Sequence, residues 1–312
     1  MSSLKFNKNK IENLIKKSFP NSEIETYQQF STGLVSPTFK VKLKNPSKTL
    51  VVKLGKLKNK SKFHQNNKIL NYLHEHQLPA PEVFFDGIFD RKFITIMDYS
   101  SGEVASKIYQ KANSQLRKKI LIAVGKNLQL IHNLKIPTFW VHQHHEVKNK
   151  EEWKKWTKLR IEKYLTFLKN KLSNYSDFLE KELDEFWKIL EKEKIDFVPL
   201  HWDYHLHNLN VDSKGKVTGI FDFDNAMKGH SLADLGQSAY WLRFEMNDYE
   251  NFDSFLKGYK NKFTNKELRL IRGYYLLHLL AVTRSLWFKQ KRLGWIIDKH
   301  KEILDEFTKQ RF

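Results

Sequence analysis

The residues with the clearest chemical potential are two aspartates and an asparagine, about two thirds of the way along the chain. Asn208 follows Asp203 after four intervening residues, and Asp222 stands at the end of an apolar, strand-like segment. Phosphoryl transfer to a hydroxyl needs one carboxylate that orients the hydroxyl and accepts its proton. It also needs an amide oxygen and a second carboxylate that hold Mg²⁺ against nucleotide phosphates. A loop with Asp203 and Asn208, followed by a hairpin that returns Asp222, would bring the three together.

Three neighbouring features have more than one interpretation. His201 precedes Asp203 by two residues and could carry a proton, but support of the loop is the favoured role. Asp224 is either the anchor of a turn or a residue that reaches the active site. The basic run Lys53–Lys62 could attract a phosphate-rich substrate or a polyanion, and a solvated hairpin is the favoured interpretation.

The elements that must position these residues change in character along the chain. Apolar alternation predicts strands near Glu25–Phe30, Phe39–Leu43, Leu50–Leu54, Val83–Phe85 and Lys92–Met97, with a helix around Ile69–Leu73. Helical periodicity follows over Ile108–Leu134 and Glu151–Lys194, then a β-rich passage over Phe197–Phe223, and helices again from Ser231. We therefore expect an α+β protein with a small β-rich N-terminal lobe, residues 1–98, and a larger, mainly helical C-terminal lobe, residues 99–312.

Composition excludes several classes of protein. Of the 312 residues, 40% are hydrophobic, which supplies a core and excludes wholesale disorder. The chain has no cysteine, so disulfides, a cysteine nucleophile and thiolate metal sites are excluded. The net charge of +20 could indicate an anionic partner, but lysines occur throughout, so a solvated basic surface is favoured and no nucleic acid is expected. No segment is apolar enough to span a bilayer or to act as a secretory signal, and we expect a cytoplasmic protein.

The central motif resembles that of a known superfamily. His201-x-Asp203-x4-Asn208, followed by Ile220-Phe-Asp222-Phe-Asp, looks like the aminoglycoside phosphotransferase and choline kinase superfamily of small-molecule kinases. This resemblance implies a protein-kinase-like two-lobed fold, with ATP and Mg²⁺ as cofactors and a small-molecule hydroxyl as the acceptor. It implies that Asp203 is the catalytic base, with His201 beside it, and that Asn208 and Asp222 hold the metal.

Other segments match the superfamily in the right order. Gly33 and Ser36 lie where the phosphate-covering loop is expected, and Lys53 matches the strand lysine that pairs with the nucleotide phosphates. Met97, Asp98 and Tyr99 resemble the segment whose backbone receives adenine, and Asp234 resembles a late aspartate that steadies the catalytic loop. The resemblance therefore assigns nucleotide binding to residues 1–98, and catalysis and acceptor binding to residues 99–312.

The chain departs from the superfamily pattern at three places. Trp202 stands where Gly or Asn is common, and His207 stands where a small residue often precedes the asparagine. A glutamate usually pairs with the strand lysine from the N-lobe helix, but the matching position here is about Asn66 or Asn67. Either an amide replaces the carboxylate, or another acid compensates, or Lys53 is less well positioned and catalysis is weaker.

The acceptor is the least determined part of the prediction. Aromatic residues that could form a box for a cation are abundant in the insertion and the C-terminal helices, among them Trp153, Trp156, Tyr164, Tyr240, Trp241, Tyr274, Tyr275 and Trp287, with Glu245 and Asp248 nearby. They favour an amino alcohol such as choline. Aminoglycosides, homoserine and thiamine stay open as alternative acceptors. The sequence also leaves open whether ATP or GTP is the preferred nucleotide, and the oligomeric state. The rival function is a catalytically weak nucleotide-binding module with a basic surface for RNA or membrane.

Overall fold

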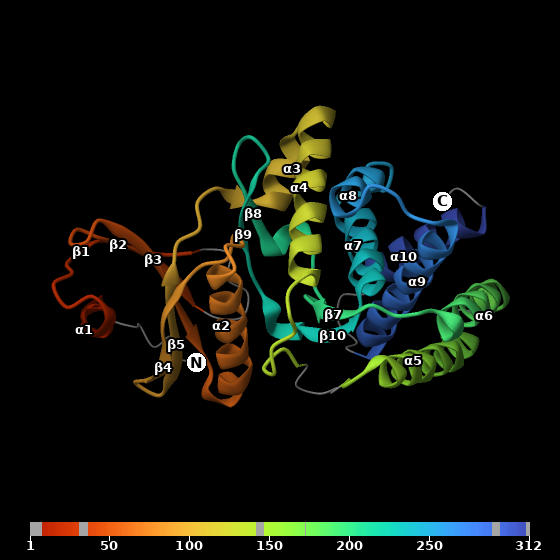
Figure 1. The fold of residues 1–312 in the computed structure, drawn as a ribbon, viewed down its shortest axis with the longest axis horizontal. Helices are drawn as coiled ribbons and strands as arrows, with labels where there is room; N and C mark the ends of the chain where they lie inside the picture. The colour runs from red at the N-terminus through yellow and green to blue at the C-terminus, as the bar shows by residue number, and fades with distance from the viewer. Residues whose placement is uncertain (1–7, 31–36, 142–146, 172, 289–293, 310–312) are drawn as a thin grey trace. The chain divides into compact units, whose positions relative to one another are not determined.

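The computed structural model describes residues 8–30, 37–141, 147–171, 173–288 and 294–309 (Figure 1). The chain divides into two compact units. The N-terminal unit comprises Met1–Glu103 with Leu209–Ser213 and Val217–Asp224, and the C-terminal unit comprises Val104–Asn208, Lys214–Lys216 and Asn225–Phe312. The first holds a five-stranded antiparallel sheet and the second is mainly helical, which confirms the predicted α+β fold class.

A sheet of order β1-β2-β3-β5-β4 forms the N-terminal unit. Its strands are β1 (Ile24–Gln29), β2 (Thr38–Leu43), β3 (Lys48–Gly55), β4 (Val83–Phe89) and β5 (Lys92–Asp98), and its helices are α1 (Lys8–Ser18), the 3₁₀ turn η1 (Leu57–Asn59) and α2 (Lys60–Glu75). Alternation along β2 buries Phe39, Val41 and Leu43 on one face. These side chains share a core with Ile11 and Leu14 of α1, so α1 covers that face.

The other face of the sheet carries Lys53 and is covered by α2. Lys53 in β3 stands opposite Thr38 of β2 and Thr95 of β5, so these three side chains point to the same face. The amide of Asn67 on α2 donates a 2.8 Å hydrogen bond to the Thr95 hydroxyl, and Figure 1 shows α2 alongside β4 and β5. The strand lysine therefore faces the helix from which the superfamily usually offers a glutamate.

A hairpin from late in the sequence belongs to the N-terminal unit. It consists of β8 (Leu209–Val211) and β9 (Val217–Ile220), and Ile220 N donates a 2.8 Å hydrogen bond to Pro79 O. Close by, Gly102 has a φ of +84°, and a Cβ there would lie 2.3 Å from Val211 O, so a side chain is excluded at this position. The strand β6 (Glu103–Val104) follows directly. The hairpin returns Asp222 to the unit that holds the sheet.

The C-terminal unit contains the remaining elements. Its helices are α3 (Ala105–Lys111), α4 (Ser114–His132), α5 (Lys150–Lys171), α6 (Ser176–Lys192), α7 (Ser231–Met246), α8 (Phe252–Tyr259), α9 (Asn265–Phe288) and α10 (Gly294–Thr308). The short elements are η2 (Ser173–Tyr175), η3 (Leu206–Asn208), η4 (Phe223–Asn225, which crosses the boundary), and the antiparallel pair β7 (Phe197–Leu200) and β10 (Met227–His230). Helix α4 packs on α8, and α7 on α9.

Two helices that the periodicity predicts as continuous are interrupted. The predicted helix over Ile108–Leu134 is divided into the end of α3 and the whole of α4. Asn113 stands between them, and its side chain caps α4 by accepting a 2.9 Å hydrogen bond from Leu116 N. The predicted helix over Glu151–Lys194 is split by η2 into α5 and α6. Among the described residues, no helix combines the length and the apolar character that crossing a membrane requires.

Candidate active site

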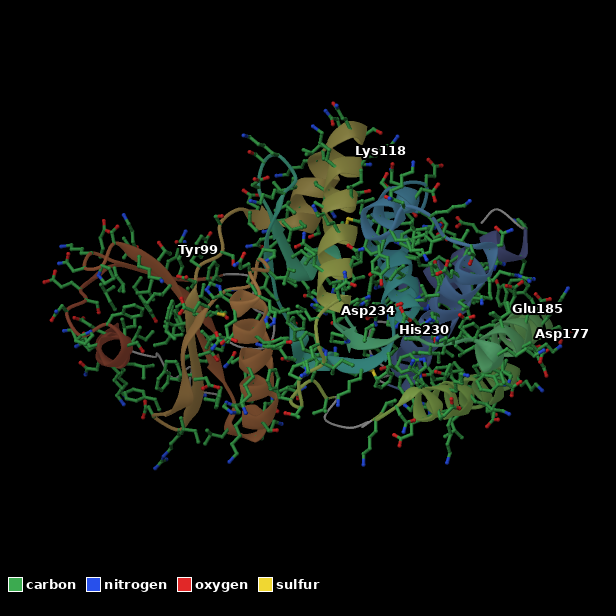
Figure 2. The ribbon with its side chains drawn as sticks, viewed as in Figure 1. Tyr99, Lys118, Asp177, Glu185, His230 and Asp234 are labelled. Carbon is green, nitrogen blue, oxygen red and sulfur yellow. The ribbon has the colours of Figure 1, made fainter. Side chains whose placement is uncertain are left out.

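The loop between β7 and η3 holds the predicted base, and one buried carboxylate fixes the backbone of this loop. Asp234, in the first turn of α7 (Figure 2), accepts hydrogen bonds from the backbone N–H groups of His201 at 2.8 Å and Trp202 at 3.0 Å. It is 0% exposed and also contacts His132 Nε2 at 3.1 Å. Charge-assisted bonds of this kind are strong because water does not compete for them. The interpretation of Asp234 as the residue that steadies the loop therefore has a direct structural basis.

His201 and Asp203 have different environments within that loop. His201 is 0% exposed, and its ring packs edge-on against Tyr204, as expected of a side chain that supports the loop. The Asp203 side chain keeps 24% of its surface exposed. One of its carboxylate oxygens lies 3.7 Å from His205 Nε2, and the other lies 3.5 Å from Asn225 Nδ2. The loop thus presents a carboxylate that is held but still open to solvent.

Asn208 is brought to the same loop by the 3₁₀ turn η3. Its Nδ2 donates a 2.9 Å hydrogen bond to the backbone carbonyl of Asp203, which fixes the orientation of the amide. The oxygen of that amide is not used in this bond and is the atom that a hard cation prefers. Within the C-terminal unit, the structure therefore brings together three predicted residues: His201, Asp203 and Asn208.

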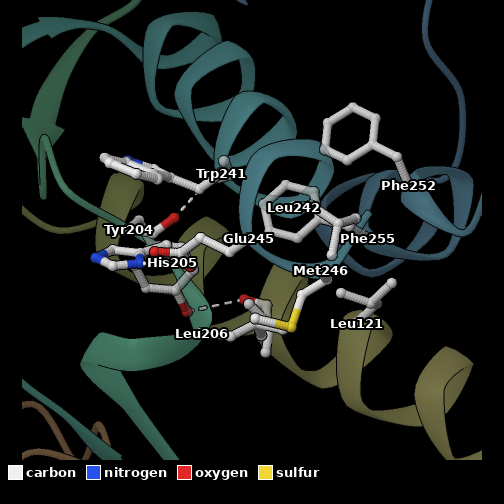
Figure 3. Close-up of a pocket in the computed structure, with 12 residues that line it drawn as sticks. Leu121, Tyr204, His205, Leu206, Trp241, Leu242, Glu245, Met246, Phe252 and Phe255 are labelled. Atoms are coloured by element: carbon white, nitrogen blue, oxygen red, sulfur yellow. Dashed lines mark hydrogen bonds and ion pairs between the residues drawn. The ribbon is translucent and has the colours of Figure 1, made fainter. Parts of the chain in front are cut away.

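A polar cluster beside Asp203 contains Glu245, which the sequence indicated only as a possible neighbour of an acceptor-binding aromatic box, together with His205 and His207. His205 Nδ1 lies 3.1 Å from Glu245 Oε2, and His207 Nε2 lies 3.5 Å from the same oxygen. Ser106 Oγ bonds the other ring nitrogen of His207 at 3.0 Å. Figure 3 shows His205 and Glu245 next to Trp241, whose ring stacks on His205. The bulky His207 is thus accommodated by specific partners, which the spacing of the motif alone could not show.

Trp202, the other departure, adopts a left-handed backbone conformation. Its φ is +61°, which explains why Gly or Asn would suit this position. The indole packs at 5.7 Å, centre to centre, on both Trp153 and Trp156. Aromatic packing of this kind contributes about 0.5–1.5 kcal/mol per pair beyond burial. The ring contacts therefore offset the cost of the backbone.

We expect Trp202→Gly to be more stable than Trp202→Ala by roughly 0.5–1 kcal/mol. Both variants lose the indole, but only alanine keeps a Cβ in the left-handed region, and this cost exceeds the gain from restricting the unfolded chain. Denaturant unfolding of both variants measures the difference. The same pair at Trp156, within α5, is the control, and there alanine should be the more stable by about 1 kcal/mol. An alanine advantage at both positions would contradict the prediction.

The N-terminal unit holds a second cluster, around Asp222. Asp222 has a φ of +63°, and Lys62 of α2 pairs with the Asp224 carboxylate at 3.2 Å. Burial and the Asp222 charge raise the pKa of Asp224, whereas the ammonium groups of Lys62 and Lys53 oppose that rise. Among the described residues, Asp224 Oδ1 is buried without a hydrogen-bond partner. The Asp224 carboxylate therefore experiences the charges of two lysines and of the Asp222 carboxylate within this unit.

The position of the expected glutamate is taken by amides with other partners. Asn66 Oδ1 accepts a 2.9 Å hydrogen bond from Phe223 N, the residue after Asp222, and Asn67 bonds Thr95. In the part of the chain that the structure describes, no carboxylate lies within ion-pair distance of Lys53. Its Nζ instead lies 5.1 Å from the centre of the Phe63 ring. Helix α2 thus contacts the acidic segment through hydrogen bonds and an ion pair, and meets the strand lysine only through the Phe63 ring.

The segment predicted to receive adenine uses its N–H groups within the unit. Asp98 N donates to Glu82 O at 2.8 Å, and Tyr99 N donates to Thr49 O at 3.2 Å. Met97 stands opposite Val51 in the sheet. Adenine would therefore have to use other groups of this segment, such as carbonyl oxygens. Gly33 and Ser36, predicted to cradle the phosphates, lie outside the described residues.

Comparison with known proteins bears on the family and the fold of the chain. Residues 26–270 match the family model described as "Phosphotransferase enzyme family". A thermostable mutant of aminoglycoside phosphotransferase APH(4)-Ia, solved with AMP-PNP and hygromycin B, is 16% identical, with 95% of this chain and 97% of that chain covered and a TM-score of 0.66. The complex of APH(2'')-IIa with streptomycin and ATP is 18% identical, with 98% of this chain and 97% of that chain covered and a TM-score of 0.60. APH(3'')-Id from Streptomyces rimosus, in complex with ADP and streptomycin, is 12% identical, with 86% of this chain and 98% of that chain covered and a TM-score of 0.53.

These likenesses concern the fold, and they confirm the predicted protein-kinase-like class. No curated protein matches the chain.

Proposed function

Because the chain belongs to the phosphotransferase enzyme family, we propose that it transfers the γ-phosphoryl group of ATP to a hydroxyl of a small molecule, with Mg²⁺. The observation that carries this proposal is the loop of the C-terminal unit. It presents the Asp203 carboxylate on a backbone fixed by Asp234, and the Asn208 amide is hydrogen-bonded to the backbone carbonyl of Asp203. This arrangement supplies the base and one metal ligand that phosphoryl transfer requires.

The acidic cluster of the N-terminal unit has the donor set that suits Mg²⁺. Asp222 and Asp224 are carboxylates two residues apart, one oxygen of Asp224 is buried without a partner among the described residues, and hard cations prefer such oxygens. In our proposal, Asp222 and Asn208 hold the metal. Bound Mg²⁺ would neutralise charge on the phosphate oxygens.

Each remaining residue has one role in the proposal. Asp203 orients the acceptor hydroxyl and accepts its proton, and His201 supports the loop. Lys53 neutralises phosphate charge, the backbone around Gly33 and Ser36 cradles the phosphates, and Met97–Tyr99 borders adenine. Nucleotide binding is thus assigned to residues 1–98, and catalysis and acceptor binding to residues 99–312. A cytoplasmic location stays a prediction.

The acceptor has two candidate classes from the sequence and from the comparisons. An amino alcohol such as choline was predicted from the abundance of aromatic residues, and an aminoglycoside is suggested by what the similar structures bind. The aromatic rings next to Asp203 give choline no particular support, because the guanidinium of Arg160 already lies over Trp156 and Trp202. The alternative is a catalytically weak nucleotide-binding module. The observation that favours it is that Lys53 has no carboxylate partner among the described residues.

The proposal is tested by ADP release with Mg²⁺ and ATP against a panel of acceptors. The panel contains aminoglycosides, choline, ethanolamine, sugars, thiamine and hydroxy acids, and each product is examined by ³¹P NMR for a phosphate monoester. We expect one class of acceptor to stimulate ADP release, and only with Mg²⁺ present. If nucleotide binds but no acceptor is phosphorylated, the non-catalytic alternative is favoured. Absence of any nucleotide binding would overturn the proposal.

A further inference from the structure

Arg160 of α5 lies close to the loop of the proposed base, and it is a cation without an acidic partner among the described residues. Its guanidinium lies 4.4 Å from the centre of the Trp156 ring and 5.5 Å from that of Trp202, the residue before Asp203. Its Nε contacts the Tyr164 hydroxyl at 3.4 Å. Within the described ranges, no carboxylate lies at ion-pair distance from this guanidinium. Guanidinium groups are planar donors that match carboxylates in pairs of hydrogen bonds.

A continuous wall of rings leads from Arg160 to helix α9. Trp156 packs on Trp153 at 5.1 Å between ring centres, and Trp153 Nε1 donates a 2.9 Å hydrogen bond to the Tyr274 hydroxyl. His278 lies one helical turn after Tyr274, on the same face of α9. Burial, and after it the charge of Arg160, lower the pKa of His278 to about 3. The imidazole is therefore neutral, and the guanidinium is close enough to act on it.

Two N–H groups on this wall, those of His278 and Trp241, lack an acceptor in the part of the chain that the structure describes. Gln237 Nε2 donates to His278 Nδ1 at 3.2 Å, so the imidazole hydrogen is placed on Nε2. His278 Nε2 and Trp241 Nε1 are both buried and have no hydrogen-bond partner among the described residues. The two rings lie 5.7 Å apart, and Trp241 stacks on His205, whose Nε2 is 3.7 Å from the Asp203 carboxylate. Buried polar groups without partners are uncommon, and a bound ligand or an ordered water is a common explanation.

Resting on the proposed function, we propose that the acceptor carries a carboxylate, which Arg160 binds together with the N–H groups of Trp241 and His278. All three are donors, so the complementary group is an acceptor of hydrogen bonds. One full positive charge with two neutral donors suits a singly charged carboxylate better than a phosphate dianion. A quaternary ammonium acceptor would need the faces of aromatic rings such as Trp156 and Trp202, and the positive charge of Arg160 on those rings would repel it. The acceptor class is therefore a small hydroxycarboxylic acid.

Binding of matched compounds to the full chain tests this inference without turnover. The probes are D-gluconate, L-homoserine and 4-hydroxybutyrate, each beside its amide, followed by saturation-transfer NMR. We expect at least one acid to bind and its amide to bind more weakly. Loss of a charge-assisted hydrogen bond corresponds to a decrease in affinity of between about 10-fold and 150-fold. Equal binding of acids and amides, or binding of none of the acids, would overturn the inference.

Arg160→Met provides the residue-level test, because methionine keeps an unbranched stem against the rings. We expect it to weaken acid binding to the level of the amide, and to raise the KM of an acid acceptor much more than it changes kcat. Nucleotide affinity should be unchanged. Lys158→Met, on the same helix but stacked on Trp187, is the control and should behave as wild type. An equal effect of Arg160→Met on acid and amide would overturn the assignment.

The two proposals fail in distinguishable ways. If Mg²⁺ and ATP do not bind to the wild type, the proposed function fails, whatever the acids do. If choline or an aminoglycoside is phosphorylated and no acid binds, the proposed function holds and the inference about the acceptor fails.

Discussion

Asp203→Asn is expected to lower kcat for phosphoryl transfer by between about 10²-fold and 10⁴-fold, the usual contribution of a positioned general base. Asparagine has nearly the same shape and keeps an oxygen for the contact with Asn225 Nδ2, but its neutral amide does not accept the proton of the acceptor hydroxyl. The nucleotide does not depend on this side chain in our proposal. Its dissociation constant, measured by calorimetry with Mg²⁺, should therefore stay close to that of wild type.

Two controls make this result specific. Asp177→Asn changes the same kind of side chain on the exposed start of α6 (Figure 2) and should leave kcat unchanged. Thermal unfolding of the Asp203 variant should resemble that of wild type, because the loop is held through the backbone of His201 and Trp202 by Asp234. Undiminished transfer by the folded variant would refute the role of Asp203.

Asp222→Asn is expected to remove most of the Mg²⁺-dependent part of nucleotide affinity, and to lower transfer by about 10²-fold to 10³-fold. These magnitudes correspond to the several kcal/mol that a metal ion contributes to transition-state stabilisation. The substitution leaves an amide oxygen but removes the negative charge that a hard cation requires. Asparagine tolerates a left-handed backbone as well as aspartate does, so the φ of +63° at this position is preserved.

The measurement is the nucleotide dissociation constant with Mg²⁺ and with a chelator. In wild type the two values should differ, and in Asp222→Asn they should converge toward the chelator value. Asp224→Asn is the matched control, two residues away. Its carboxylate is already paired with Lys62, so we expect a smaller loss of Mg²⁺ dependence. A larger loss in Asp224→Asn than in Asp222→Asn would transfer the metal role to Asp224.

The missing glutamate of the N-lobe helix has a structural explanation. In this chain α2 contacts the acidic segment itself, through Asn66 to the Phe223 amide and through Lys62 to Asp224. The helix therefore supports the predicted metal ligand Asp222 through its neighbours instead of pairing with Lys53. Hydrogen bonding to the backbone next to Asp222 helps to hold a left-handed conformation that an aspartate adopts only with support.

Local sequence determined the elements and the order of the motifs. Alternation of apolar residues predicted the sheet strands, and five of them are present near the expected positions. The spacing of Asp203 and Asn208 predicted one loop, because residues so close in the chain can meet within a turn, and the structure joins them by a hydrogen bond. Periodicity was less informative about interruptions, since α5 and α6 read as one helix although η2 separates them.

Contacts between distant residues were decided by tertiary structure. Glu245 reaches His205 from 40 positions away, Asn66 reaches Phe223 across 157, and Arg160 meets Trp202 only because α5 packs beside the loop. None of these pairs has a sequence signal, because a single glutamate, asparagine or arginine on a helix looks like any solvated polar residue until packing removes water from it. The amino-acid sequence therefore determined the proposed base and its nearest metal ligand. The packing of the C-terminal unit decided which donors surround the proposed acceptor.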